Sequence, residues 1–403
     1  MQRRISRRYI ILIFVLAFVI RLAYAIVTPP FQAPDEYSHY SYVKFVHNFR
    51  QLPVQPNPAV RPEELEFHQP PLYYVLAAFL FPSTDLIAGR PLLALRFMNI
   101  LFSMLTILVV YWFGSSILPH KPFTVANICA AVALLPTYSY LSATMRNGTL
   151  AVLFASLGFY VCSKAVLDAD QQRNARWSWV GALAGLAILS KLSALGFAAA
   201  AGIMVWATSA NLKIALHRAG WFCLGVMSTA GWWFLRNWMV YGHVLKVIEN
   251  GSGYVPPPLS WAHEKQSAIV IFKTFWAVFG RINELHFADI YRFYWLFVSL
   301  AVMGIVRYLL QRRHDLPASL AGFFALAIGF SLAATLYYAH NYDSDQGRYM
   351  FPVLIPISTF IGLGLQTLFP EKYHRWVLNT VLFGSAAINI VILARLANVY
   401  WRF

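Results

Sequence analysis

Long apolar segments recur along almost the whole chain, and short stretches that carry most of the charges separate them. A helix needs about 20 apolar residues to cross about 30 Å of hydrocarbon, so a chain of 403 residues has room for about eleven such helices. Hydrophobic residues make up 59% of the chain and charged residues 12%, against about 45–50% and about 25% in soluble domains. The pattern therefore predicts an all-α polytopic membrane protein and excludes a soluble globular one.

The apolar segments predict eleven spans in a single integral membrane domain, residues 1–403. The predicted spans are residues 10–27, 92–114, 122–142, 149–167, 177–190, 193–209, 217–236, 291–310, 316–338, 350–369 and 376–396. The stretch 177–209 is too long for one upright span and short for two. We interpret it as a hairpin of two short helices with Lys191 at the tip, because the short basic loops then all fall on one side.

The distribution of basic residues predicts how the chain lies in the membrane. Lys and Arg number 32 and Asp and Glu 16, which gives a net charge of +16, but these charges punctuate apolar runs and do not form a nucleic-acid-binding surface. The positive-inside rule predicts a cytoplasmic N-terminus, with the first helix uncleaved because no small-residue cleavage site follows it. A cleaved signal peptide is the less favoured alternative. Two long loops, 28–91 and 237–290, then lie on the outer face of the membrane.

The first loop opens with the segment FQAPDEYSHY, in which two adjacent carboxylates, Asp35 and Glu36, are followed by His39. One helical turn separates Glu36 from His39, so the two side chains share a face. A partly desolvated carboxylate at this position has the basicity of a useful proton acceptor. The alternative is that Asp35 is only the N-cap of a helix. The spacing leaves both possibilities open.

Later in the same loop, FHQPPLYYVL predicts a rigid extended segment that leads into an interfacial helix. His68 is a candidate ligand or proton shuttle, although a surface histidine is the commoner case. Three cations fall at the outer ends of predicted spans: Arg146 in TMRNGTL, Lys191 in SKLSAL and Arg348 in DSDQGRYMFP. Arginine suits a phosphate because its guanidinium donates two parallel hydrogen bonds. The alternative is that these residues are interfacial anchors or, for Arg348, a local ion pair.

Taken together, the acidic pair after the first span, the His-x-Pro-Pro-Leu-Tyr segment, the Lys-Leu-Ser hairpin and the Gln-Gly-Arg-Tyr boundary resemble the GT-C superfamily of membrane glycosyltransferases. PDEYSH, WFLRNWMVYG, FWAVFG and QGRYMFP look closest to a bacterial membrane family of undefined function that is grouped with it. The resemblance runs from about residue 10 to residue 370. It is specific for the superfamily and does not indicate the sugar.

This resemblance implies transfer of a sugar from a polyprenyl-phosphate donor to an envelope glycan, lipid or protein acceptor on the outer face. It implies Asp35 as the general base with Glu36 beside it, and a single inverting displacement. The substrate-binding residues that we expect are His39, His68, Arg146, Lys191, Arg348 and Tyr349.

One departure from the superfamily concerns metal binding, because many members carry an acidic residue where this chain has Arg146-Asn147-Gly148. We therefore expect no metal or other cofactor; the alternative is a metal held by Asp35, His39 or His68. Two other functions remain open, a transporter or flippase of a lipid-linked glycan and a non-catalytic scaffold. A transporter needs polar residues along a path through the membrane, whereas here they gather at the outer ends of the predicted spans, which favours an enzyme.

Overall fold

The structure of the chain is a computed structural model, which describes residues 2–56, 61–81, 91–168, 174–246, 255–279, 287–312 and 315–401. Within these residues every regular element is helical, so the predicted all-α class is confirmed. Parts of both predicted outer loops, residues 57–60, 82–90, 247–254 and 280–286, lie outside the described residues.

Seven of the described helices are long and apolar enough to cross a membrane. These segments contain the helices α1 (Gln2–Val27), α4 (Pro91–Ile117), α7 (Gly148–Leu167), α13 (Ala288–Leu310), α14 (Ala318–Tyr342), α15 (Leu354–Leu368) and α16 (His374–Tyr400). Shorter helices of the bundle are α5 (Pro122–Ala133), α6 (Pro136–Leu141), α8 (Arg176–Ser190), α9 (Leu195–Ala207), α10 (Leu212–Val226) and α11 (Trp232–Tyr241). The π-helical turn η4 (Met227–Gly231) joins α10 to α11. All eleven predicted spans fall on helices, while the number that cross the membrane stays a prediction.

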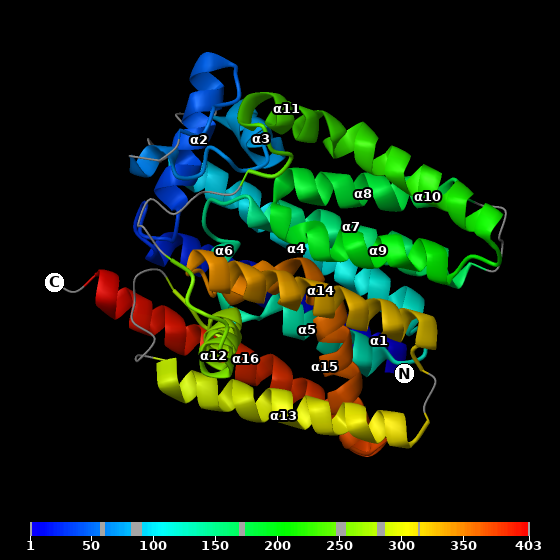
Figure 1. Cartoon of the computed structure of the whole chain (residues 1–403). Coiled ribbons are helices and arrows are strands. Elements are labelled where there is room, and N and C mark those ends of the chain that lie inside the picture. The colour runs from blue at the N-terminus through cyan, green and yellow to red at the C-terminus, as the bar shows by residue number, and fades with distance from the viewer. Residues whose placement is uncertain are drawn as a thin grey trace.

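The remaining helices lie at the ends of the bundle or join its members. They are α2 (Glu36–Phe49), α3 (Leu72–Leu80) and α12 (Trp261–Trp276), with the 3-10 helices η1 (Pro62–Glu64), η3 (Leu192–Ala194), η6 (Gly347–Val353) and η7 (Glu371–Tyr373). In Figure 1, α12 is seen down its axis while its neighbours run across the view, so it lies across the ends of the spans. The interfacial helix predicted after His68 is thus the separate helix α3.

Two local features differ from or refine the predicted spans. The predicted span 122–142 is broken after Ala133, because Pro136 begins α6 as its first residue and has no N–H to continue a helix. The stretch 177–209 forms α8 and α9 with Lys191 between them, as the hairpin interpretation predicts. Figure 1 shows the N-terminus and the C-terminus at opposite ends of the bundle, which fits an odd number of spans.

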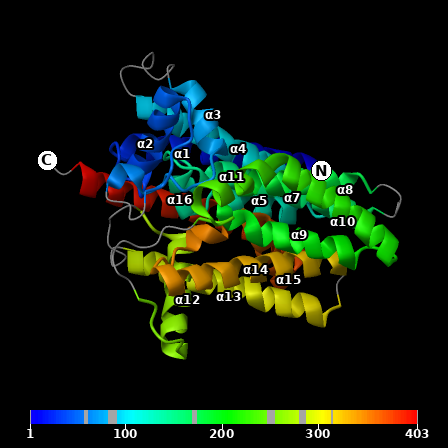
Figure 2. The ribbon, with the colours of Figure 1, turned by 45° about the horizontal axis from the view of Figure 1, so that its top comes forward.

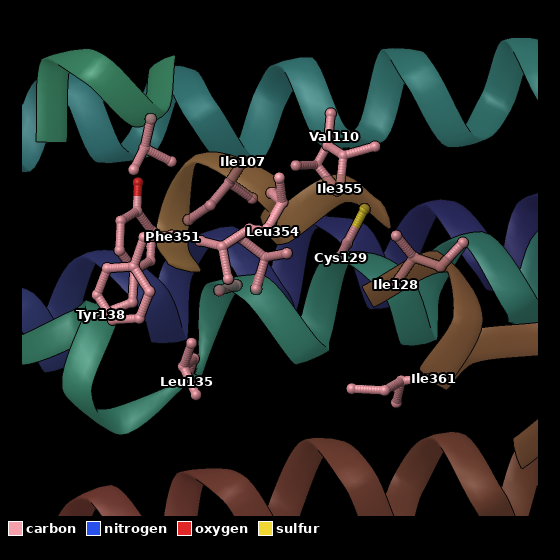
Figure 3. Packing of buried hydrophobic residues seen from close by; sticks show 14 of the residues in the cluster. Ile107, Val110, Ile128, Cys129, Leu135, Tyr138, Phe351, Leu354, Ile355 and Ile361 are labelled. Atoms are coloured by element: carbon pink, nitrogen blue, oxygen red, sulfur yellow. The ribbon is translucent and has the colours of Figure 1, made fainter. Parts of the chain in front are cut away.

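The core lies where α4, α5 and α15 meet alongside α1. Figure 3 shows their side chains interleaved, and Ile107, Val110, Ile128 and Ile355 are completely buried there. Because lipid tails are as apolar as these side chains, close packing rather than water exclusion stabilises such helix contacts in a bilayer. The turned view in Figure 2 shows α2 and α3 stacked at one end of α4, and this arrangement positions the first loop over the end of the bundle.

Candidate active site

A cavity of about 440 Å³ opens at this end of the bundle, between the first loop, the α8–α9 turn, α14 and η6. Its charged, imidazole and amide lining residues are Asp35, His39, Glu66, His68, Gln69, Lys191, Lys246 and Arg348. Its hydroxyl-bearing lining residues are Ser193, Ser331, Thr335, Tyr337, Tyr338, Tyr342 and Tyr349. The cavity therefore contains six of the eight predicted site residues. Of the other two, Arg146 lines a smaller cavity that shares Lys191 and Arg348 with the first, and Glu36 lies outside both.

Asp35 occupies the N-cap position of α2, but its side chain makes no capping hydrogen bond. The backbone adopts the left-handed conformation, with φ 62°, which Asp tolerates better than most residues. The carboxylate is free to pair with cations from elsewhere in the fold. Arg348 donates to its Oδ2 at 2.7 Å, and the guanidinium of Arg146 lies 3.7 Å from the same oxygen. Burial raises the pKa of Asp35, but the charges of Arg348 and Arg146 outweigh it and hold the pKa well below its ordinary value.

Glu36 points away from the cavity into a buried ion pair with Arg96, at 2.6 Å, and is completely buried. It also accepts hydrogen bonds from the backbone N–H groups of Phe31 and Met145, both at 3.0 Å. Arg96 in turn donates to the carbonyl groups that follow α1. The structure therefore does not bring Glu36 to the cavity, although Glu36 and His39 are both buried residues of α2. Glu36 ties the first loop to α4 and to the α6–α7 turn.

The two predicted histidines are buried rather than exposed. His39 shares a hydrogen bond of 2.8 Å between its Nδ1 and the Tyr74 hydroxyl. Burial and the nearby charge of Arg146 hold the pKa of His39 well below its ordinary value. Burial also lowers the pKa of His68 to about 4. Both imidazoles are therefore neutral near pH 7 and can accept or donate one proton each.

Three cations converge on Asp35 from separate parts of the chain: Arg146 from the α6–α7 turn, Lys191 from the α8–α9 turn and Arg348 from η6. Buried N–H donors lack a hydrogen-bond partner at Nε of Arg348 and at Nε and one terminal nitrogen of Arg146, among the described residues. Burial and the neighbouring Arg348 and Arg146 lower the pKa of Lys191 to about 7. Unpaired buried donors are costly, so these N–H groups would gain from an anion that reached them.

Glu66 is the cavity residue that sequence reasoning missed. Burial and the negative charge of Asp35 raise its pKa to about 7, and its Oε2 is buried with no hydrogen-bond partner in the described part of the chain. The only signal in the sequence is its position two residues before His68. Donor atoms of Asp35, His39 and Glu66 lie within 4.8 Å of one another and could hold a metal ion. The guanidinium groups of Arg146 and Arg348 at the same place oppose a further cation.

Arg348 is positioned by the close packing of η6 on α12. The Thr274 hydroxyl accepts a hydrogen bond of 2.8 Å from the Gly347 N–H. A Cβ at residue 347 would overlap the backbone of Ile271 and Phe275, so glycine is required there. The ring of Tyr349 lies 5.7 Å from the ammonium of Lys191 and 5.8 Å from the guanidinium of Arg348. The Gln-Gly-Arg-Tyr segment at this span boundary therefore places Arg348 and the Tyr349 ring beside Lys191.

The cavity lining also includes apolar residues. They are Leu245, Leu192 of η3, Leu195 of α9 and Ala334 of α14. Helices α9 and α14 approach closely because Gly196 lies against the backbone of Ser331, where a Cβ would not fit. The site therefore combines a cluster of cations with aliphatic side chains from the α8–α9 turn and the start of α9.

Comparisons with known proteins agree with this architecture. A family model of dolichyl-phosphate-mannose-protein mannosyltransferases matches residues 68–233. The fold is similar to that of ArnT from Cupriavidus metallidurans bound to undecaprenyl phosphate, at a TM-score of 0.55 and 16% identity, over 96% of this chain and 74% of that one. In the apo state of ArnT the TM-score is 0.54 at 16% identity, over 97% of this chain and 64% of that one.

The oligosaccharyltransferase from Archaeoglobus fulgidus is also similar, with a TM-score of 0.52 and 12% identity, over 97% of this chain and 55% of that one. No curated protein matches the sequence. ArnT and the oligosaccharyltransferase are both membrane glycosyltransferases of the GT-C superfamily, so the predicted resemblance is confirmed and the chain has a GT-C-like fold.

Proposed function

We propose that the chain is a glycosyltransferase that moves a sugar from a polyprenyl-phosphate donor to an envelope glycan, lipid or protein acceptor on the outer face of a bacterial inner membrane. The observation that carries this proposal is the convergence of Arg146, Lys191 and Arg348 beside the aliphatic side chains of the cavity. Such a cavity matches an amphipathic ligand with one anionic group and a long hydrocarbon tail. The undecaprenyl phosphate bound to ArnT has this chemistry.

In the proposed complex the donor phosphate lies among the three cations. The unpaired N–H groups of Arg146 and Arg348 donate to its oxygens, and Lys191 adds charge. The isoprenoid chain leaves the cavity along Leu192 and Leu195, between α9 and α14. These cations then stabilise the negative charge that develops on the leaving phosphate as the sugar departs.

Asp35 is the proposed general base. The acceptor oxygen or nitrogen forms a bond to the anomeric carbon as the bond to the phosphate oxygen breaks, and its proton passes to the Asp35 carboxylate. Arg348 now pairs with that carboxylate, and a donor phosphate would compete for the same guanidinium. Glu66 is the other carboxyl in the cavity, and its raised pKa keeps it partly protonated near pH 7. One free carboxylate beside a phosphate site suits a single inverting displacement.

The test is sugar transfer by the purified full-length chain in detergent, with a polyprenyl-phosphate sugar as donor. The donor and acceptor are identified first by mass spectrometry of envelope glycans from cells with and without the protein. We expect Asp35→Asn to abolish transfer and to retain binding of undecaprenyl phosphate. Arg348→Ala is expected to weaken that binding at least tenfold. Asp289→Asn is the matched control, because Asp289 is an exposed carboxylate paired with Arg395 outside the cavity.

Full transfer by Asp35→Asn would exclude Asp35 as the base, and unchanged binding by Arg348→Ala would exclude the phosphate site. The alternative, a transporter or flippase of a lipid-linked glycan, requires a sealed membrane and forms no new glycosidic bond. Transfer in detergent by the wild-type chain therefore separates the two functions.

A further inference from the structure

A second cluster of ligating side chains lies outside the cavity, where α12 meets α14. It consists of His263 and Glu264 in the first turn of α12 and His340 in the last turn of α14. Figures 1 and 2 both show α12 against that end of α14. None of the three residues lines the donor cavity, so the proposed transferase reaction leaves this cluster unexplained.

The three side chains converge on one point. One donor atom from each lies within 4.8 Å of the other two. Glu264 Oε1 is 2.8 Å from His340 Nδ1, and the imidazole rings of His263 and His340 are edge to face with their centres 5.8 Å apart. Two elements that are distant in the sequence therefore present two imidazoles and one carboxylate to a common centre.

The His263 ring has an unsatisfied atom at this centre. Its Nε2 is buried and has no hydrogen-bond partner among the described residues. A buried polar nitrogen without a partner costs about 1–3 kcal/mol, and a metal ion bound to its lone pair would remove that cost. All three side chains are partly buried, so an ion there would be shielded from bulk water while the site stays open to entry.

We propose that His263, Glu264 and His340 bind a zinc ion that clamps α12 to α14. Two imidazole nitrogens and a carboxylate oxygen are a preferred ligand set for Zn²⁺ at about 2.0–2.2 Å, with water in the fourth position. Mg²⁺ and Ca²⁺ prefer oxygen ligands throughout, so this set selects against them. The donor atoms, which lie within 4.8 Å of one another, would draw closer together around the ion.

The clamp joins α14, which lines the donor cavity, to α12, the helix on which η6 packs. Residue Thr274 of α12 holds the Gly347 N–H beside Arg348, while α14 contributes Tyr338 and Tyr342 to the cavity lining. Zinc at the α12–α14 contact fixes the two helices relative to each other, and thereby holds Arg348 in place opposite α14.

The test is zinc binding by the tag-free full-length chain in detergent, stripped with a chelator and titrated by calorimetry. We expect Glu264→Gln and His263→Ala each to bind one zinc ion fewer per chain than the wild type, or to bind that ion at least about tenfold more weakly. Zinc is expected to raise the unfolding temperature of the wild type but not of Glu264→Gln. The glutamine can keep the contact with His340, so this variant tests the ligand without removing the helix contact. Excess Mg²⁺ should not displace the zinc.

Two controls decide where any zinc binds. His217→Ala removes an exposed histidine of α10 and should bind zinc as the wild type does. Glu66→Gln removes a ligand of the Asp35, His39 and Glu66 group and should also retain this zinc ion. Wild-type zinc binding by both Glu264→Gln and His263→Ala would overturn the proposal. Loss of the ion only in Glu66→Gln would overturn it as well, because the ion would then belong to the donor cavity.

Discussion

Removing Arg96 should destabilise the fold strongly, because it would leave Glu36 as an unpaired charge in the interior. The Glu36 carboxylate is completely buried and accepts hydrogen bonds from Arg96 at 2.9 and 2.6 Å, in addition to its two backbone donors. Loss of one partner from a buried ion pair costs about 3–5 kcal/mol. In Arg96→Met two backbone N–H donors remain on Glu36, so we expect a loss near the lower end, about 3 kcal/mol.

The free energy of unfolding can be measured by titrating the full-length chain in mixed micelles with a denaturing detergent and following helicity. Arg395→Met is the matched control, since Arg395 also makes two hydrogen bonds to one carboxylate, Asp289, but both side chains are partly exposed. Exposed pairs contribute about 0–1 kcal/mol. The double variant Arg96→Met, Glu36→Gln should recover at least about 1 kcal/mol relative to Arg96→Met. Equal losses in Arg96→Met and Arg395→Met, or no recovery in the double variant, would refute the reasoning.

Two further predictions concern the donor cavity and use binding of undecaprenyl phosphate as the measurement. The pKa values of Lys191 and Glu66 are both about 7, so raising the pH through 7 removes a positive charge from the cavity and adds a negative one. The affinity for undecaprenyl phosphate should therefore fall about tenfold in the wild type and much less in Lys191→Arg. Equal pH profiles of binding in the two proteins would contradict this. Gly347→Val should displace η6 from α12 and weaken the binding of undecaprenyl phosphate about tenfold. Gly322→Val is the control and should not weaken binding, because Gly322 has open space around it. Equal effects of the two substitutions would show that the packing of η6 does not position Arg348.

The fold could be predicted from the sequence to a large extent because the bilayer imposes a simple constraint. Each apolar run must satisfy its backbone hydrogen bonds internally and so becomes a helix, and this determined the class and the order of the elements. The break after Ala133 was missed, since Leu134 and Leu135 continue the apolar pattern and only Pro136 signals the end of α5. Hydrophobicity alone does not reveal a break in a helix when the residues on both sides of the break are apolar.

The members of the site were predicted better than their arrangement. Asp35 and Arg348 are 313 positions apart in the chain, yet the structure joins them by one hydrogen bond; their motifs indicated the residue types without indicating this contact. Glu66 was missed because it is one of three Glu residues in a polar segment, where such side chains are normally solvated. Only the folding of the loop over the bundle brings it into the cavity. Helical spacing grouped Glu36 with His39, but only His39 lines the cavity, because Glu36 forms a buried ion pair with Arg96 of α4.

The two adjacent carboxylates diverge, and this bears on how the proposed reaction is controlled. Asp35 lies just before α2 in the left-handed conformation and lines the cavity, while Glu36, the first residue of α2, is buried against Arg96. Arg348 then becomes a shared partner, because a donor phosphate and Asp35 compete for the same guanidinium. A phosphate that takes this guanidinium removes the largest charge that lowers the pKa of Asp35, so the pKa of Asp35 rises. Before the donor binds, the ion pair with Arg348 makes Asp35 a weak base. Donor binding breaks this pair in the proposed complex, so Asp35 accepts a proton only when the donor sugar is present.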